Sequence, residues 1–190
     1  VRFADEIVDS FHDYDKEFLF SKFEQDLADA LEHKISLNPI LNSFQYTVNK
    51  YNIPQEMIDA FMKSMRLDLS KSEYKTTEEY QEYIYGSADV VGLMCLKVFV
   101  NGNEEKYNEL KDSAMRLGSA FQKVNFLRDL KADFEELSRT YFPNTDLNHL
   151  DEKSKQEIIA DIESDFEAAF EGIKNLPLEA KFGVYTAYRY

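Results

Sequence analysis

The sequence predicts an all-α fold in a single domain over residues 1–190, and three observations support that prediction. Apolar residues recur at helical spacing along most of the chain, and no segment alternates apolar and polar residues as a half-buried strand does. Clear loop signals occur at NGN, residues 101–103, and at FPNTD, residues 142–146. A chain of 190 residues that is 44% hydrophobic is also long enough to bury one sizeable core.

Local signals divide the chain into a series of helices. Pro39 and Pro54 suit the first turns of two helices, and Thr76 with Glu79 forms a capping-box pattern at the start of another. A buried stripe is expected on the helix after Pro54, made of Ile58, Phe61, Met62, Met65 and Leu69. The segment after the NGN loop is either one long helix or two helices joined near Gly118. The expected helices cover residues 1–14, 16–33, 39–50, 54–70, 76–100, 104–138, 151–174 and 177–190.

Both ends of the chain lie inside helical patterns. VRFADEIVDSF starts without Met and resembles the middle of a helix, and the chain stops inside the apolar pattern KFGVYTAYRY. We therefore expect a fragment trimmed at both ends.

The charge balance and the single cysteine argue against several classes of protein. Acidic residues outnumber basic ones by 36 to 22, for a net charge of −14, so a basic groove for nucleic acid is not expected. Cys95 lies in the apolar run VVGLMCLKVFV, where we expect a buried, reduced thiol, and one cysteine forms no disulfide within the chain. This run is too short to span a bilayer, and we find no signal peptide, so a cytoplasmic protein is expected.

One helical segment combines an apolar composition with a polar face. In FQKVNFLRDLKADF, residues 121–134, the polar face consists of Gln122, Asn125, Asp129 and Asp133, at spacings of three, four and four. Like charges one turn apart destabilise a helix, and partial burial increases that cost. From the pattern alone two interpretations stay open. The two aspartates pair with Arg128 and Lys131, or they bind a divalent cation.

The same spacing of acids occurs elsewhere, and its context differs. Asp161 and Asp165 lie in DIESDFEAAFEG, where acids point to several sides of the helix, so we expect an ordinary solvated surface there. Asp5 and Asp9 form a D-x-x-x-D pair near the start of the chain. Magnesium prefers oxygen ligands and usually combines one or two carboxylates with substrate phosphates. Two helices that each present such a pair across a bundle would therefore hold metal ions over a diphosphate.

At these residues the sequence resembles the squalene and phytoene synthase family of head-to-head prenyl transferases, over most of its length. The segment RFADEIVD resembles the family's first acidic motif through Arg2, Asp5, Glu6 and Asp9, with Glu6 in place of the usual second Asp. The segment QKVNFLRDLKADFEELSRTYFP resembles the second motif, through Gln122, Asn125, Arg128, Asp129, Asp133, Arg139, Tyr141 and Pro143.

The region between the two motifs also resembles the family. YIYGSADVVG matches its middle segment at Tyr83, Tyr85, Gly86, Ala88, Val91 and Gly92, and SMRLDL resembles a family helix that contains Asp68. Two positions depart from the pattern. Asp89 replaces a usual Gly, and Arg139 lies one residue farther from Asp133 than in many members.

The resemblance implies an isoprenoid synthase-type helical bundle with a central cavity. Two prenyl diphosphates would condense there head to head through a cyclopropyl diphosphate, with loss of pyrophosphate. The implied metal is Mg²⁺, with Mn²⁺ as an alternative, and its ligands would be Asp5, Asp9, Asp129 and Asp133. The implied catalytic residues are these four aspartates and Tyr83. The implied substrate-binding residues are Arg2, Ser87, Gly92, Gln122, Asn125, Arg139 and Tyr141.

Several alternatives remain at this point. The leading prediction is a phytoene synthase-like enzyme that uses two geranylgeranyl diphosphates without NADPH. The alternatives are a squalene or dehydrosqualene synthase that uses farnesyl diphosphate, and a non-catalytic relative that acts as an assembly factor. Tyr83 and Tyr85 are also explained as aromatic packing residues, and Gly86 and Gly92 as sites of close helix contact. His12, His33 and His149 show no ligand spacing. Since the substrates are lipids, peripheral membrane contact through an apolar patch is expected.

Overall fold

The structure is a computed structural model that describes residues 1–71, 74, 76–135 and 152–190, with side chains described up to Arg128 in the long central helix. Within these ranges the chain is helical and contains no strand, as the sequence predicts. The elements are α1 (Arg2–Asp9), α2 (Lys16–His33), α3 (Pro39–Tyr51), α4 (Gln55–Leu67), α5 (Thr77–Ile84), the π-helix η1 (Tyr85–Asp89), α6 (Val90–Phe99), α7 (Glu104–Glu135), α8 (Glu152–Asn175) and α9 (Leu178–Arg189).

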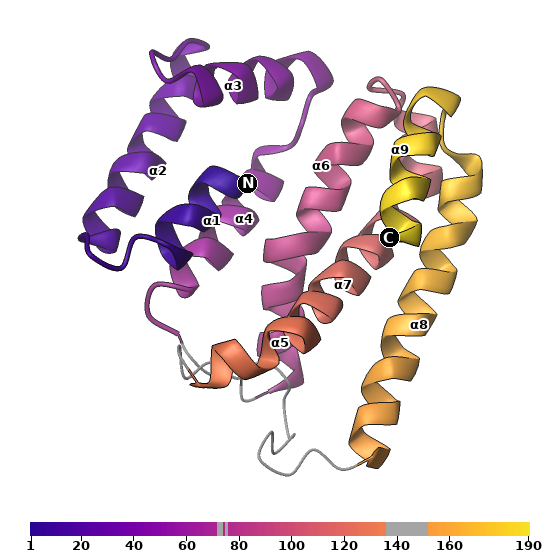
Figure 1. The fold of residues 1–190 in the computed structure, drawn as a ribbon. Coiled ribbons are helices and arrows are strands. Elements are labelled where there is room, and N and C mark those ends of the chain that lie inside the picture. The colour runs from indigo at the N-terminus through magenta and orange to yellow at the C-terminus, as the bar shows by residue number, and fades with distance from the viewer. Residues whose placement is uncertain (72–73, 75, 136–151) are drawn as a thin grey trace.

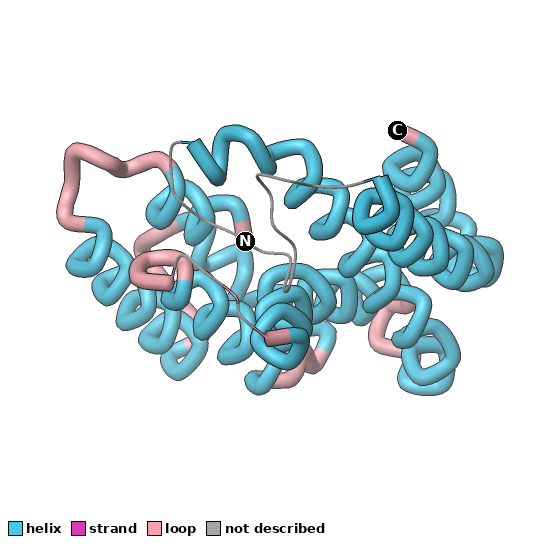
Figure 2. The backbone as a smooth tube through the Cα atoms, turned by 90° about the horizontal axis from the view of Figure 1, so that it is seen from below, coloured by secondary structure: helices cyan, strands magenta, loops and turns pink. Residues whose placement is uncertain are grey.

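The helices form two groups on either side of α6. Helices α1 to α4 lie on one side and α7 to α9 on the other, and α6 contacts both α4 and α7 (Figure 1). The most extensive contact between two helices joins α7 and α8. Seen from below, several helices are viewed nearly end-on, as in a bundle (Figure 2). This arrangement makes α6 the central wall of the molecule.

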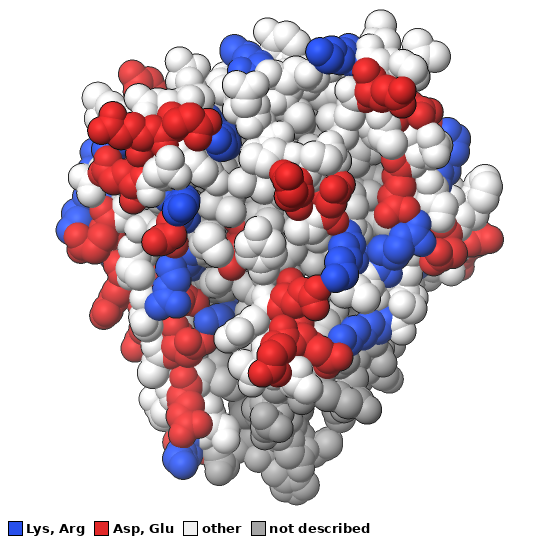
Figure 3. Space-filling view, turned by 180° about the vertical axis from the view of Figure 1, so that it is seen from behind, with Lys and Arg blue, Asp and Glu red and all other residues white. Residues whose placement is uncertain are grey.

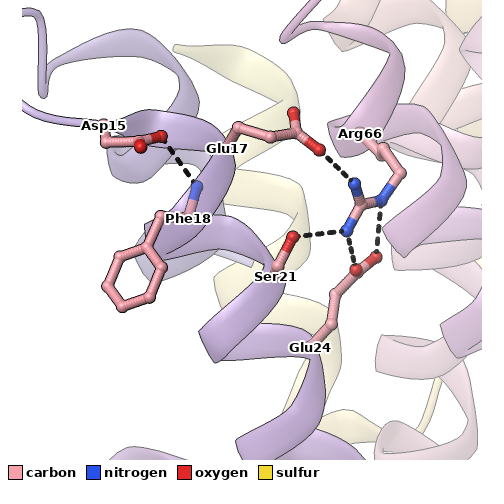
Figure 4. A network of polar contacts seen from close by, with 6 residues as sticks. All are labelled: Asp15, Glu17, Phe18, Ser21, Glu24 and Arg66. Atoms are coloured by element: carbon pink, nitrogen blue, oxygen red, sulfur yellow. Dashed lines mark hydrogen bonds and ion pairs between the residues drawn. The ribbon is translucent and has the colours of Figure 1, made fainter.

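The first helix is shorter than the predicted segment 1–14, because α1 ends at Asp9. Two polar contacts fix this break. The Nζ atom of Lys16 donates to the carbonyl oxygen of Val8 at 2.7 Å, which satisfies a carbonyl in the last turn of α1. The side chain of Asp15 then accepts from the backbone N–H of Phe18 at 2.9 Å and caps α2 (Figure 4). The sequence analysis placed the start of the second helix correctly and extended the first helix five residues too far.

The predicted helix 76–100 begins as expected and is then interrupted. The Thr76 hydroxyl accepts from the N–H of Glu79 at 3.2 Å, which confirms the start of α5. At Tyr85–Asp89 the chain forms a π-helical turn before α6 continues in nearly the same direction. Such a turn carries one extra residue per turn and occurs frequently at functional sites.

The segment after the NGN loop is one helix, so the second of the two alternatives near Gly118 is wrong. Gly118 has a packing role instead. A Cβ atom at this position would lie 2.7 Å from the carbonyl oxygen of Ala88 and 3.2 Å from the Cα atom of Asp89. The missing side chain therefore lets α7 approach the backbone of η1 closely.

The largest apolar core joins α1, α2, α3, α4 and α6. It confirms the predicted stripe on α4, since Ile58, Phe61, Met62 and Met65 are buried and Leu69 packs against them. Two smaller clusters complete the interior. One surrounds Tyr83 and Phe126, and the other lies between α6, α7 and the turn before α9.

An ion-pair network holds α2 against α4 (Figure 4). The guanidinium of Arg66 donates to Glu17 at 2.7 Å and to the hydroxyl of Ser21 at 3.2 Å, and it also pairs with Glu24. The Cζ atom of Arg66 lies 5.3 Å from the centre of the Phe20 ring. One arginine thus links three residues of α2, which fixes the position of α2 beside the helix that supports α1.

The surface carries an excess of acids. On the face shown in Figure 3, basic side chains are scattered among acidic ones rather than gathered in a single stripe. In the part of the chain that the structure describes, no helix is long and apolar enough to cross a membrane.

Candidate functional site

The first candidate element is the outer face of α1. Ala4, Ile7 and Val8 are buried against the core, which leaves Asp5 and Asp9 exposed on the opposite side, one turn apart. Partial burial of its carboxyl group raises the pKa of Asp5, and the nearby carboxylates of Asp9 and Glu6 raise it further. A pair of carboxylates that repel each other in this way favours the binding of a cation.

Arg2 lies on the same helix, one turn before Asp5 and Glu6. Its guanidinium pairs with Glu6 at 3.4 Å in an exposed contact. It also lines a second cavity of about 390 Å³ between α1, α2, α3 and α4. Exposed pairs of this kind contribute little stability, so the arginine is free to exchange Glu6 for an anionic ligand.

The second acidic pair lies where side chains are not described. Asp129 and Asp133 belong to the last turns of α7, and their side chains fall outside the described residues. Arg139 and Tyr141 also fall outside them. In Figure 1 the C-terminal end of α7, drawn in orange, extends toward the half of the molecule that holds α1 and α2. Among the described residues, no group of three or more His, Cys, Asp or Glu side chains forms a metal site.

A largely apolar cavity of about 340 Å³ lies between α6, α7, α8 and α9, next to η1. Three of the predicted substrate-binding residues line it: Ser87, Gly92 and Gln122. The rest of its wall is mostly aliphatic and aromatic, which suits an apolar ligand with a polar group at one end.

Gly92 has both of the roles that the sequence left open. It lines the cavity, and a Cβ atom there would lie 2.6 Å from the carbonyl oxygen of Ala114 on α7. A side chain at this position would therefore disturb both the contact between α6 and α7 and the wall of the cavity.

Tyr83 lies in an aromatic cluster rather than on the cavity wall. Its side chain is buried, and its hydroxyl donates to a carboxylate oxygen of Asp68 at 2.9 Å. Its ring centre lies 4.7 Å from that of Tyr74 and 6.0 Å from that of Phe126 on α7. Asp68 therefore holds the orientation of Tyr83. Asn125 is half-buried on α7, one residue before Phe126.

Cys95 differs from its prediction. The thiol was expected to be buried, yet the residue is exposed and lines the 340 Å³ cavity. Surrounding protein atoms still raise the pKa of this thiol. Periodicity showed that Cys95 lies on an apolar helix, but it could not show that the face of that helix borders a hollow.

The prediction of a solvated surface at Asp161 and Asp165 is wrong for Asp165. Asp161 is exposed, whereas Asp165 is fully buried on α8, with 0% of its surface accessible. Its carboxylate pairs with Arg116 at 2.8 Å and with Lys123 at 2.7 Å, both on α7. Arg116 and Lys123 are seven residues apart and share one face of α7. This pair of basic residues is the feature of the sequence that could have indicated a buried acidic partner.

Asp89 lies close to this charge cluster. It is buried in η1 and accepts a hydrogen bond from the hydroxyl of Ser119 on α7 at 2.7 Å. Burial, reinforced by the charge of Asp165, raises its pKa to about 6. The residue that departs from the family pattern thus ties η1 to α7 beside the close contact at Gly118.

Comparison with known proteins places the chain in a family. A model of the squalene/phytoene synthase family matches residues 1–190. The phytoene synthase of Daucus carota is 35% identical over 103 residues, which is 53% of this chain and 26% of that protein. The 15-cis-phytoene synthase of a Synechocystis strain is 30% identical over 195 residues, which is 90% of this chain and 54% of that protein. The chain thus spans about half the length of the second relative and less of the first.

Solved structures agree on the fold. Squalene synthase HpnC from Alicyclobacillus acidocaldarius superposes with a TM-score of 0.80 at 21% identity, over 98% of this chain and 73% of that one. A dehydrosqualene synthase in complex with ligand gives 0.78 at 21% identity, over 93% of this chain and 65% of that one. Both neighbours have isoprenoid synthase-type helical folds. Since the family model covers the whole sequence and the architecture agrees with it, this chain belongs to the squalene/phytoene synthase family of head-to-head prenyl transferases.

Proposed function

We propose that the protein condenses two molecules of geranylgeranyl diphosphate head to head and forms phytoene, with loss of pyrophosphate. The observation that carries this proposal is the apolar cavity that has Ser87 and Gln122 in its wall. Gln122 lies on α7, the helix that also contains Asp129. Gln122 precedes Asp129 by seven residues, which is about two helical turns. A prenyl tail in the cavity would therefore have its diphosphate near the acidic end of α7.

We propose that Mg²⁺ binds between the two aspartate pairs. The donor chemistry of α1 fits this ion, because Asp5 and Asp9 offer carboxylate oxygens one turn apart, and partial burial together with the charge of Asp9 raises the pKa of Asp5. Asp129 and Asp133 would supply the matching ligands from α7. Bound magnesium supplies Lewis-acid neutralisation of the charge that develops on the departing pyrophosphate.

The side chains of this chain would bind and orient the substrates. Arg2 would exchange its exposed contact with Glu6 for a phosphate oxygen, and Arg139 and Tyr141 would contribute from beyond the described residues. Gln122 and Asn125 would orient the diphosphate from α7. Tyr83, held by Asp68, would contribute a fixed aromatic ring and hydroxyl near the reacting carbons. The aliphatic wall around Gly92 would exclude water from cationic intermediates.

Product analysis tests this proposal. The protein is incubated with Mg²⁺ and either farnesyl or geranylgeranyl diphosphate, without NADPH, and the hydrocarbon is identified by gas chromatography and mass spectrometry. We expect a C40 hydrocarbon from the C20 substrate. A C30 hydrocarbon as the main product would identify a squalene or dehydrosqualene synthase instead.

Pyrophosphate binding distinguishes an enzyme from a non-catalytic relative. We expect Mg²⁺-dependent binding of pyrophosphate by the wild-type protein and its loss in Asp5→Asn. Asp13→Asn removes another exposed carboxylate, just beyond α1, and serves as the control. Binding that persists in Asp5→Asn, together with no hydrocarbon product, would favour the assembly-factor alternative.

A further inference from the structure

The cavity follows one face of α6 along its whole length. On the side formed by η1 and α6, the wall consists of Ser87, Ala88, Val91, Gly92, Cys95, Leu96 and Phe99. The opposite wall on α7 consists of Leu110, Ser113, Ala114, Leu117, Gly118, Phe121 and Gln122. Alternating spacings of one and three residues place each set on a single helical face. The cavity is therefore a channel along α6 and α7, with residues of α8 and α9 completing its wall.

The register of the two helices is fixed by two close contacts. Gly118 meets the carbonyl oxygen of Ala88, and Gly92 meets that of Ala114. The helices therefore run antiparallel, and the Gln122 end of α7 lies beside the Ser87 end of α6. Leu110 lies toward the opposite end, level with Leu96 in the same cluster.

The two ends of the channel differ in polarity. At one end lie Ser87, whose buried hydroxyl oxygen has no hydrogen-bond partner among the described residues, and Gln122. At the other end lie Leu96, Phe99, Leu110 and Leu176. A ligand with a polar head and an apolar tail would therefore place its head at the Ser87 end and its tail toward Phe99.

The length of the channel can be compared with that of a prenyl tail. Ser87 and Phe99 are twelve residues apart, as are Leu110 and Gln122, so each wall is about 18 Å long at the rise of an α-helix. The length of a prenyl unit can be estimated from an extended polypeptide, which advances about 3.3–3.6 Å for every three backbone bonds. A prenyl unit adds four chain bonds, so at the same advance per bond it extends about 4.4–4.8 Å. Three units then extend about 13–14 Å and four units about 18–19 Å.

We propose that Phe99 forms the end of this channel and sets the length of the prenyl tail, with a C20 tail ending against its ring. A C15 tail would end about one turn earlier, just past Cys95, which lies about 12 Å from Ser87 along α6. This inference rests on the proposed function, because it takes a prenyl diphosphate as the ligand. Phe99 is 37% exposed, so its substitution leaves the buried core intact.

The single cysteine allows the tail to be located directly. The rate at which N-ethylmaleimide alkylates Cys95 is measured by mass spectrometry with Mg²⁺ and geranyl, farnesyl or geranylgeranyl diphosphate. We expect farnesyl and geranylgeranyl diphosphates, at roughly ten times their Kd, to slow alkylation about tenfold. Geranyl diphosphate, whose tail extends only about 9–10 Å, should protect the thiol much less.

Moving the thiol to the proposed end of the channel is the decisive step. In the double variant Cys95→Ser/Phe99→Cys, geranylgeranyl diphosphate should slow alkylation about tenfold and farnesyl diphosphate should leave it nearly unchanged. The matched control is Cys95→Ser/Phe182→Cys, whose thiol replaces a residue that is 80% exposed on α9 and lies outside the cavity wall. No diphosphate should protect that thiol.

A size series at the same position gives an independent readout. Phe99→Trp should lower the affinity for geranylgeranyl diphosphate relative to farnesyl diphosphate about tenfold, because the larger ring shortens the channel. Phe99→Ala should allow a C25 diphosphate to bind as well as the C20 one. Both affinities are measured by titration calorimetry in the presence of Mg²⁺.

The outcomes separate this inference from the proposed function. If farnesyl and geranylgeranyl diphosphates protect Cys95 but protect the Phe99→Cys thiol equally, or not at all, the role of Phe99 is wrong and the prenyl site stands. If no prenyl diphosphate protects Cys95 and none binds with Mg²⁺, the proposed function itself is wrong, and the inference is wrong with it.

Discussion

Asp89 is a carboxylic acid enclosed by η1, α7 and the nearby charges of α8. Its oxygen accepts from Ser119, and burial raises its pKa to about 6 from an ordinary value of 3.8. Because the unfolded chain ionises this group at lower pH than the native protein does, its contribution to stability decreases as pH rises from about 4 through about 6. The native structure therefore favours the protonated form of Asp89 over the ionised form.

This property leads to a prediction for Asp89→Asn. An amide keeps an acceptor for Ser119 and removes the cost of a buried negative charge. We expect its Tm to exceed that of the wild type by about 2–4 °C at pH 7.5, the shift that roughly 1 kcal/mol produces in a domain of this size. The difference should vanish as pH falls to about 4. Thermal melts at pH 4, 5, 6 and 7.5 measure it, and a difference that stays constant with pH would contradict it.

Asp165 shows the opposite case of a buried acid with two cationic partners. Removing its charge in Asp165→Asn leaves Arg116 and Lys123 without their shared partner inside the protein, which should cost about 3–5 kcal/mol. Asp161 is the exposed second partner of Lys123, so Asp161→Asn leaves Lys123 paired with Asp165 and should cost less than about 1 kcal/mol. Urea unfolding of both variants checks the contrast. Equal losses would mean that the burial of Asp165 has no energetic consequence.

At the scale of helices, local signals predicted most of the elements and missed their interruptions. Helices α2, α3 and α8 begin and end within about two residues of the predicted limits, because caps and prolines mark their ends. The π-turn at Tyr85–Asp89 was not predicted, since it depends on the close approach of α4 and α7 to the glycines of this region. Contacts between distant segments decide such features, and periodicity within one segment does not record them.

The close contact at Gly92 gives a prediction for the helix pair α6 and α7. In Gly92→Ala, the new methyl group would lie 2.6 Å from the carbonyl oxygen of Ala114, so the two helices must separate. We expect a loss of about 1–3 kcal/mol in the free energy of unfolding. Gly183→Ala on α9 is the control, because no atom lies within 4 Å of its added Cβ, and it should gain about 0.5–1 kcal/mol. Equal effects in the two variants would argue against the close contact.

At the scale of the whole molecule, the sequence predicted the all-α bundle and its family. Ser87, Gly92 and Gln122 do line one cavity, whereas Tyr83 lies beside it in an aromatic cluster. The shape of the cavity could not be predicted from the sequence, because it depends on how the faces of four helices pack together. The exposure of Cys95 and the burial of Asp165 were missed for the same reason.

The net negative charge of the chain affects how the proposed site would bind a diphosphate. Because the chain carries a net charge of −14, it repels diphosphates, and we expect their binding to depend on cations held at the proposed aspartate sites. Removal of divalent metal with EDTA should therefore abolish the binding of geranylgeranyl diphosphate, and added Mg²⁺ should restore it. Calorimetric titrations with and without metal measure this dependence, and undiminished binding in EDTA would contradict it.

The central claim is that the aspartates of α1 and α7 bind metal and pyrophosphate together, and one double-mutant cycle tests it directly. Isothermal titration calorimetry measures Mg²⁺-dependent pyrophosphate binding by the wild type, Asp5→Asn, Asp129→Asn and the double variant. If both residues belong to one site, each single variant should weaken binding by at least about tenfold, and the double variant should lose much less than the sum of the two free-energy changes. Fully additive losses, or binding that is unchanged in either single variant, would show that the two acidic pairs do not share a metal site.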